Sequence, residues 1–155
     1  MILAATAADF AALRDGRAPR GFRLPDSPIA SPPVLGMLAE LADSIALVFA
    51  PAAWLIVEDG EVVGLCSITR MPLGNAVNIG YGVAPTRQSR GSAGRAVGDI
   101  VAWARTDARI HRLTAETTPD NTPSQRVLER NGFLRCGERH DPEDGLVICW
   151  QVTTS

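Results

Sequence analysis

Apolar and polar positions follow two different periods along this chain, one typical of strands and one typical of helices. Between Ala53 and Pro72, two apolar runs flank Asp59-Gly60, a residue pair favoured in tight turns, so this segment predicts a β-hairpin. After Ser92 the spacing becomes helical, and one stripe carries Ala93, Ala96, Val97, Ile100, Val101 and Ala104. This stripe predicts an amphipathic helix with one face against a core.

The remaining elements follow from the same periods and from residues that start or stop helices. Thr6 is a predicted N-cap, and Thr122 with Gln125 fits a capping box. Pro123 then occupies the first helical position, and Gly132 suits the left-handed cap. We therefore expect strands at 2–6, 75–85, 110–118, 133–141 and 145–152, and helices at 6–16, about 34–44 and 122–133.

The order of these elements, β-α-α-β-β-β-α-β-α-β-β, predicts the sheet. The strand-helix-strand unit in the middle requires a parallel pair, while the hairpins place antiparallel strands beside it. A mixed sheet with helices on its faces follows, which is an α/β fold. Because 155 residues are enough to bury one core, we expect a single domain over residues 1–155.

Composition and charge remove several functional classes. Apolar residues make up 46% and charged residues 21% of the chain, and a net charge of −2 argues against nucleic acid as a partner. No apolar stretch approaches a membrane span, and the first residues lack the pattern of a signal peptide. Cys66, Cys136 and Cys149 have no metal-ligand spacing, which indicates reduced thiols in a cytoplasmic protein without a metal site.

The stretch VNIGYGVAPTRQSRGSAGRAV, residues 77–97, joins a strand to a helix through a turn that contains Gly91 and Gly94. Such a turn points several backbone N–H groups at one place, where the helix dipole adds positive charge, so a phosphate is a natural ligand. The glycines do not match a dinucleotide fingerprint, and a chain without lysine has no nucleoside-triphosphate loop. A plain helix start is the alternative.

Two motifs, one after the other along the chain, favour the phosphate site over a plain helix start. Gln88, Gly91 and Ala93 form the pattern Q/R-x-x-G-x-G/A directly after a strand, and NTPSQRVLERNGF follows further along the chain. Together they resemble the GNAT acyltransferase superfamily, and within it the branch of ribosomal-protein N-terminal acetyltransferases. The resemblance covers about residues 54–152.

This resemblance implies a fold and a co-substrate. The fold is a mixed, mostly antiparallel sheet whose central parallel strands, Val77–Val83 and His111–Thr117, splay apart, with helices on both faces. The co-substrate is acetyl-CoA, with its pyrophosphate in the glycine turn and its pantetheine along the open strand. The residues implied to bind it are Tyr81, Val83, Gln88, Ser89, Arg90, Gly91, Ser92, Ala93, Gly94, Asn121 and Ser124.

The catalytic groups depart from the family pattern. Many members carry Tyr where this chain has Leu128, and relatives often carry Glu where it has Asn78, so the usual acid and base are missing. Ser124 is then the candidate to contact the thiol, or else an ordinary first-turn helix residue. Glu116, at the end of a central strand, is the candidate base acting through a water, or else a solvated carboxylate.

The acceptor is the least determined part. We expect its pocket between the irregular, proline-rich segment Ala18–Pro33 and the hairpin RHDPEDG, residues 139–145. His140 and Asp141 are candidates to line it, or else exposed turn residues. Arg14, Arg17, Arg20 and Arg23 would suit an acidic acceptor, although a scattered charge run is usually solvated surface.

The resulting hypothesis is an N-acetyltransferase that moves the acetyl group from acetyl-CoA directly to a primary amine in a ternary complex. Without a strong base, the α-amine of a peptide or of a small metabolite is the favoured acceptor. The alternatives are a catalytically weak acyl-CoA-binding module that senses or regulates, and a nucleotide-binding domain of unrelated chemistry. The family resemblance also allows a homodimer.

Overall fold

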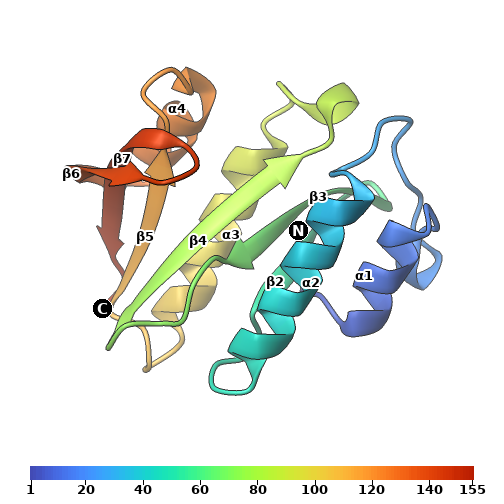
Figure 1. The fold of residues 1–155 in the computed structure, drawn as a ribbon, viewed down its shortest axis with the longest axis horizontal. Helices are drawn as coiled ribbons and strands as arrows, with labels where there is room; N and C mark the ends of the chain where they lie inside the picture. Colours follow the sequence, from blue (N-terminus) through green and yellow to red (C-terminus); the bar gives the residue numbers. More distant parts are fainter.

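One seven-stranded sheet runs through a computed structural model that describes residues 1–155 (Figure 1). Its strands are β1 (Ile2–Ala4), β2 (Ala53–Glu58), β3 (Glu61–Ile68), β4 (Ala76–Val83), β5 (Arg112–Thr117), β6 (Leu134–Asp141) and β7 (Gly145–Thr153). The helices are α1 (Ala7–Arg14), α2 (Pro32–Ala46), α3 (Ser92–Arg105) and α4 (Thr122–Arg130), with short 3₁₀ turns η1 (Pro19–Gly21) and η2 (Pro85–Arg87).

The strand order in the sheet is β1-β2-β3-β4-β5-β7-β6. Only β4 and β5 are parallel, and every other neighbouring pair is antiparallel. The parallel pair lies in the middle because the chain crosses over through α3 before it returns as β5 (Figure 1). The predicted α/β fold class and the predicted order of elements are therefore confirmed.

Helices cover the two faces of the sheet differently. In front of the sheet in Figure 1, α1 and α2 pack over β2 and β3, where Phe10, Leu13 and Leu35 meet Leu55 and other strand residues. Behind it, α3 and α4 bury a larger cluster. None of these helices combines the length and the apolar character needed to cross a bilayer.

Local signals explain most element ends, with one correction. Thr6 caps α1 in a capping box with Asp9, as the sequence predicts for the cap. The capping box predicted for α4 is wrong, because Asn121 is the N-cap and its Oδ1 accepts from the Ser124 amide at 3.2 Å. The Gln125 side chain instead donates to the carbonyls of the preceding loop.

The central strands separate, as the family resemblance implies. Their pairing runs from Ala76 with Arg112 to Ile79 with Ala115 and then stops. Beyond Ile79, β4 keeps its antiparallel partner β3 without a register shift, so the glycines at 80 and 82 do not form a bulge between these strands. In Figure 1 the two arrows diverge toward the ends that carry η2 and α4.

The close approach of β3 and β4 depends on Gly64, because a Cβ at this position would overlap the carbonyl oxygen of Gly82. A Cβ on Gly82 itself would meet no atom within 4 Å. We predict that Gly64→Ala lowers stability by about 1–3 kcal/mol, since overpacked sites move backbone or neighbours. Gly82→Ala is the matched control and should unfold close to the wild type. Chemical denaturation checks both variants, and equal midpoints would contradict the prediction.

Candidate functional site

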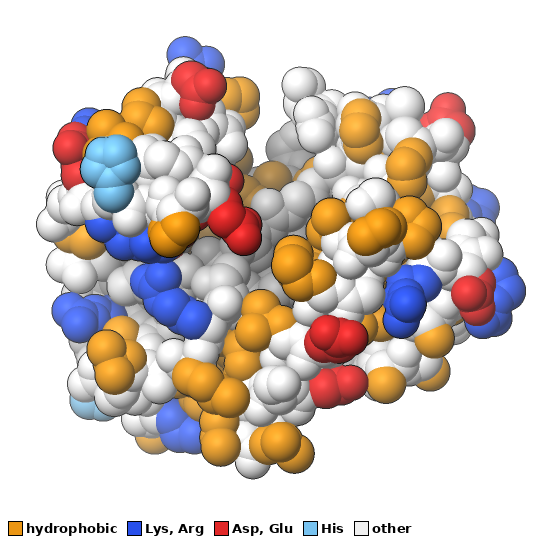
Figure 2. All heavy atoms as spheres, in the orientation of Figure 1, with side chains coloured by type: hydrophobic (Ala, Val, Ile, Leu, Met, Phe, Trp, Pro, Cys, Tyr) orange, Lys and Arg blue, Asp and Glu red, His pale blue; other side chains and the backbone are white.

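The opening between β4 and β5 forms a cleft of about 550 Å³, bounded by the start of α3 and by α4. Figure 2 shows the surface hollowed between the end of β4 and α4. All the residues that the sequence assigned to acetyl-CoA line this cleft except Arg90. The Arg90 carbonyl accepts from Arg95 Nη2 at 3.1 Å, and its side chain lies outside the cleft.

The start of α3 differs from the starts of the other helices. The side chains of Thr6, Ser31 and Asn121 accept a backbone N–H at the starts of α1, α2 and α4. Helix α3 instead begins after Gly91, in a left-handed conformation with φ 80°, and no side chain caps it. The first amides of a helix have no partner within it. Those of α3 are therefore free for a ligand in the cleft.

The open edge of β4 provides a second set of backbone groups. The Asn78 carbonyl accepts from the Thr69 amide, and the Ala84 amide donates to Val63, so the even-numbered residues of this stretch bond toward β3. Because backbone directions alternate along a strand, the amides and carbonyls of Tyr81 and Val83 face the opening. The Val83 carbonyl accepts from Gln88 Nε2 at 3.1 Å.

A hydroxyl pair crosses the cleft. The Tyr81 hydroxyl lies 2.7 Å from Ser124 Oγ and also donates to the Ser124 carbonyl at 3.3 Å. Burial raises the pKa of Tyr81 to about 12, so the phenol stays protonated at neutral pH. Leu128, at the position where many family members have Tyr, is fully buried and offers no hydroxyl.

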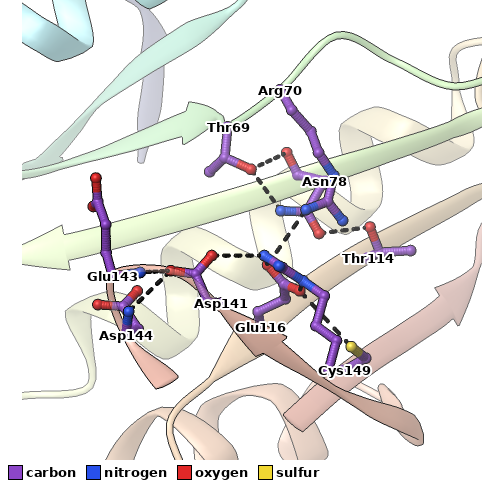
Figure 3. Close-up of polar contacts among 10 residues, drawn as sticks. Thr69, Arg70, Asn78, Thr114, Glu116, Asp141, Glu143, Asp144 and Cys149 are labelled. Atoms are coloured by element: carbon purple, nitrogen blue, oxygen red, sulfur yellow. Dashed lines mark hydrogen bonds and ion pairs between the residues drawn. The ribbon is translucent and has the colours of Figure 1, made fainter. Parts of the chain in front are cut away.

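A polar cluster occupies the other face of the sheet, where the strands part (Figure 3). Arg139 and Arg70 both bind the Glu116 carboxylate, and the Cys149 thiol donates to it at 3.8 Å. The hydrogen bond from Arg139 is the main cause that lowers the pKa of Glu116. Glu116 is thus held as a carboxylate and is a weak proton acceptor at neutral pH. It also does not line the cleft.

The neutral part of this cluster is Asn78, which is buried between two threonines. Its Nδ2 donates to Thr69 Oγ1 at 2.5 Å, and its Oδ1 accepts from Thr114 Oγ1 at 2.7 Å (Figure 3). Both polar atoms of this side-chain amide are therefore hydrogen-bonded within the fold. Asn78 therefore cannot replace a carboxylate base.

The acceptor candidates near the chain ends are mostly engaged within the fold. Asp141 Oδ1 binds Arg139, and its Oδ2 accepts the amides of Glu143 and Asp144 in the hairpin turn. His140 is exposed on β6. Three of the four N-terminal arginines also have partners: Arg20 binds Asp9, Arg17 binds Asp15, and Arg23 donates to the Asp59 carbonyl.

The cleft also contains residues that were not among those assigned to acetyl-CoA from the sequence. These are Gly82, Arg87, Pro123, Arg126, Val127 and Arg130. Projection of the predicted last helix would have placed Arg126 and Arg130 on one face, because they are four residues apart. It could not have shown which face turns toward the cleft, since that depends on how α4 packs on the sheet.

Known proteins resemble this chain over most of its length. Residues 5–134 match the model of the acetyltransferase (GNAT) domain. The uncharacterized N-acetyltransferase p20 of Bacillus licheniformis is 29% identical over 90 residues, 57% of this chain and 51% of that protein. The ribosomal-protein-serine acetyltransferase of Escherichia coli (strain K12) is 27% identical over 82 residues, 52% of this chain and 46% of that protein. The chain thus spans about half the length of the curated relatives it matches.

A solved structure extends the likeness in fold. RimJ of Mycobacterium smegmatis in complex with CoA-disulfide superposes with a TM-score of 0.72, over 98% of this chain and 80% of that one, at 23% identity. At this identity the likeness shows the fold alone. The arrangement of strands and helices around the parting of β4 and β5 is therefore shared with a protein solved with a CoA derivative.

The pKa of Glu116 gives a test of the ion-pair cluster. Its folded pKa lies below the ordinary value of 4.5, so its stabilising contribution is complete above that value and is lost as pH falls through the folded pKa. We predict that the Tm difference between wild type and Glu116→Gln is largest near neutral pH and shrinks below about pH 4. Glu143→Gln, at an exposed side chain without an ion pair, is the control. A difference that stays constant with pH would contradict the prediction.

Proposed function

The chain belongs to the GNAT acetyltransferase family, and from this premise we propose that it transfers the acetyl group of acetyl-CoA to a primary amine. The observation that carries the proposal is one cleft in which the uncapped start of α3 faces the unpaired edge of β4. The start of α3 binds anions through its free amides, and the open edge of β4 can form hydrogen bonds with an extended ligand that contains amide groups. Acetyl-CoA has both, in its pyrophosphate and its pantetheine.

We assign the pyrophosphate to the turn that precedes α3, at Gln88 to Gly94. Charge-assisted hydrogen bonds contribute roughly 1.5–3 kcal/mol each, and micromolar affinity requires about 8 kcal/mol. A few such bonds would supply about half of that free energy. The remainder would come from pantetheine paired with Tyr81 and Val83, and from Asn121, whose Nδ2 is free of partners in the fold.

The transfer is a direct attack. The amine nitrogen bonds to the thioester carbonyl carbon, the carbon–sulfur bond breaks, and the amine proton and a proton for the thiolate are exchanged with nearby groups or water. We propose Ser124 Oγ as the donor to the departing thiolate, with Tyr81 orienting it from the opposite wall. An acyl-cysteine route has no support, because no cysteine lines the cleft.

The α-amine remains the favoured acceptor. Two guanidiniums hold Glu116, our sequence-based candidate for the base, and lower its pKa. The acceptor amine must therefore bind largely in its uncharged form. Ordinary pKa values are about 7.7–8.0 for an α-amine and 10.4 for lysine, a gap of about 2.5 units or 3.4 kcal/mol. We retain Glu116 only as a relay through water for an amine that already loses its proton easily.

A catalytically weak acyl-CoA sensor is the second candidate. Leu128 is buried and Asn78 is bonded between threonines, so the positions of the usual acid and base carry no proton-transfer group. Such a module would bind acetyl-CoA as tightly as an enzyme does. It would acetylate no member of a broad panel of amines.

The proposed co-substrate site has a direct test at Ala93, a half-buried residue of the first turn of α3. Acetyl-CoA at 100-fold excess over Kd should stabilise the wild type by about 2.7 kcal/mol, measured as a Tm shift. Ala93→Glu should abolish this shift, because a carboxylate repels the pyrophosphate while it suits the start of a helix. Ala93→Gln has similar bulk without charge and should keep much of the shift. Wild type that shows no shift with acetyl-CoA would refute the proposed function.

The acceptor proposal is tested with amines of different pKa. If only the neutral amine reacts, an α-amine should exceed a lysine-like amine in kcat/KM by about 200-fold at pH 7 and by about 20-fold at pH 9. Initial rates over both pH values check this. A preference for alkyl amines of high pKa would contradict the α-amine assignment and would mean that the protein supplies a strong base.

The role of Ser124 is tested by Ser124→Ala. General acids typically contribute a factor of about 100 or more to the rate, so kcat should fall by about that factor. The Kd for acetyl-CoA, measured by calorimetry, should change little. Gln125→Ala is the control on the same helix, since Gln125 binds loop carbonyls outside the cleft. Equal rates for Ser124→Ala and wild type would remove Ser124 from the mechanism.

A further inference from the structure

Two arginines on α4 face the cleft without any partner. Arg126 and Arg130 both line it, and neither side chain makes a hydrogen bond or an ion pair in the fold. They are four residues apart and therefore lie on the same face of the helix. Like charges at this spacing repel each other and destabilise a helix. An anion bound between them would remove that repulsion.

Two other arginines near the turn, Arg87 and Arg95, already have carboxylate partners. Arg87 also lines the cleft, but Glu61 holds its guanidinium with two hydrogen bonds, and Asp26 adds an ion pair. Arg95 binds Glu58 and the Arg90 carbonyl. Among the cleft residues, the uncompensated positive charge is therefore concentrated on α4.

The position of these arginines relative to the glycine turn is defined by contacts between α3 and α4. Asn131 Nδ2, directly after α4, donates to the Gly94 carbonyl at 3.1 Å, and Asn131 also lies against Gly98. The last turn of α4 thus packs on the first turns of α3. One wall of the cleft presents amides for one anionic group, and the opposite wall presents two guanidiniums for another.

Acetyl-CoA has two separate anionic groups, its pyrophosphate and the phosphomonoester on the 3′ oxygen of its ribose. The acetyl group, the pantetheine and the adenine are neutral. Guanidinium groups bind phosphate through paired, charge-assisted hydrogen bonds. If the turn takes the pyrophosphate, as the proposed function states, the group that remains for the arginines of α4 is the 3′-phosphate.

We propose that Arg126 and Arg130 form a site for the 3′-phosphate of CoA, so that the protein distinguishes CoA from 3′-dephospho-CoA. This inference rests on the proposed function, because it requires a CoA thioester in the cleft. It adds a specificity determinant on α4 that was not among the residues assigned to acetyl-CoA from the sequence motifs. The adenosine end of the ligand then lies against α4, and the thioester lies at the inner end near Tyr81 and Ser124.

The experiment measures Kd by calorimetry for CoA and for 3′-dephospho-CoA with the same protein samples. Wild type should bind CoA at least tenfold more tightly, and added salt should reduce this preference because exposed charges are screened. Arg126→Gln/Arg130→Gln should weaken CoA binding at least tenfold and leave 3′-dephospho-CoA within twofold. Arg105→Gln, at an exposed arginine at the end of α3 outside the cleft, should behave as wild type.

Each outcome separates the inference from the function on which it rests. Equal affinity of wild type for the two ligands overturns the inference and leaves the acetyl-CoA site intact. An equal loss for both ligands in the double variant also overturns it, since the arginines would then bind the pyrophosphate. Binding of neither ligand by folded wild type overturns the proposed function itself. As a check without the pantetheine, adenosine 3′,5′-bisphosphate should compete better than adenosine 5′-monophosphate against wild type, and equally well against the double variant.

Discussion

The parting of β4 and β5 is the constraint on which the rest of the structure depends. The two strands pair over four positions, from Ala76 with Arg112 to Ile79 with Ala115, and then separate. Backbone groups require partners, and beyond this point β4 has no strand partner on that side, where only the Gln88 side chain binds the Val83 carbonyl. The cleft, its hydroxyl bridge from Tyr81 to Ser124 and the free start of α3 all lie where the sheet opens.

The opening also divides the chemistry between the two faces of the sheet. On the face of α3 and α4, the groups are amides, hydroxyls and unpaired guanidiniums, which suit a long anionic ligand. On the face of α2, the groups are a saturated ion-pair cluster around Glu116 and the bonded amide of Asn78. The second set holds its protons and charges firmly, and for this reason we propose an acceptor amine that loses its proton without much help.

Much of the fold was predictable because its signals are local. The helical stripe after Ser92, the Asp59-Gly60 turn and the crossover that makes β4 and β5 parallel follow from spacing and turn chemistry. The cap of α4 was wrong by one residue, because Asn121 and Thr122 both suit an N-cap. In the structure the Gln125 side chain binds the carbonyls of Thr118 and Pro119 and so does not complete a capping box with Thr122.

The same division holds for the candidate site. By itself, the sequence determined the glycine turn, the family motifs and the residue types along the open strand, since each depends on neighbours a few positions away. Only the tertiary structure decided which arginines are free: Glu61, distant in sequence, neutralises Arg87, whereas Arg126 and Arg130 meet no carboxylate. It likewise turned Glu116 from a candidate base into the partner of two guanidiniums. Charge compensation is a property of residues brought together by folding, and no local pattern contains it.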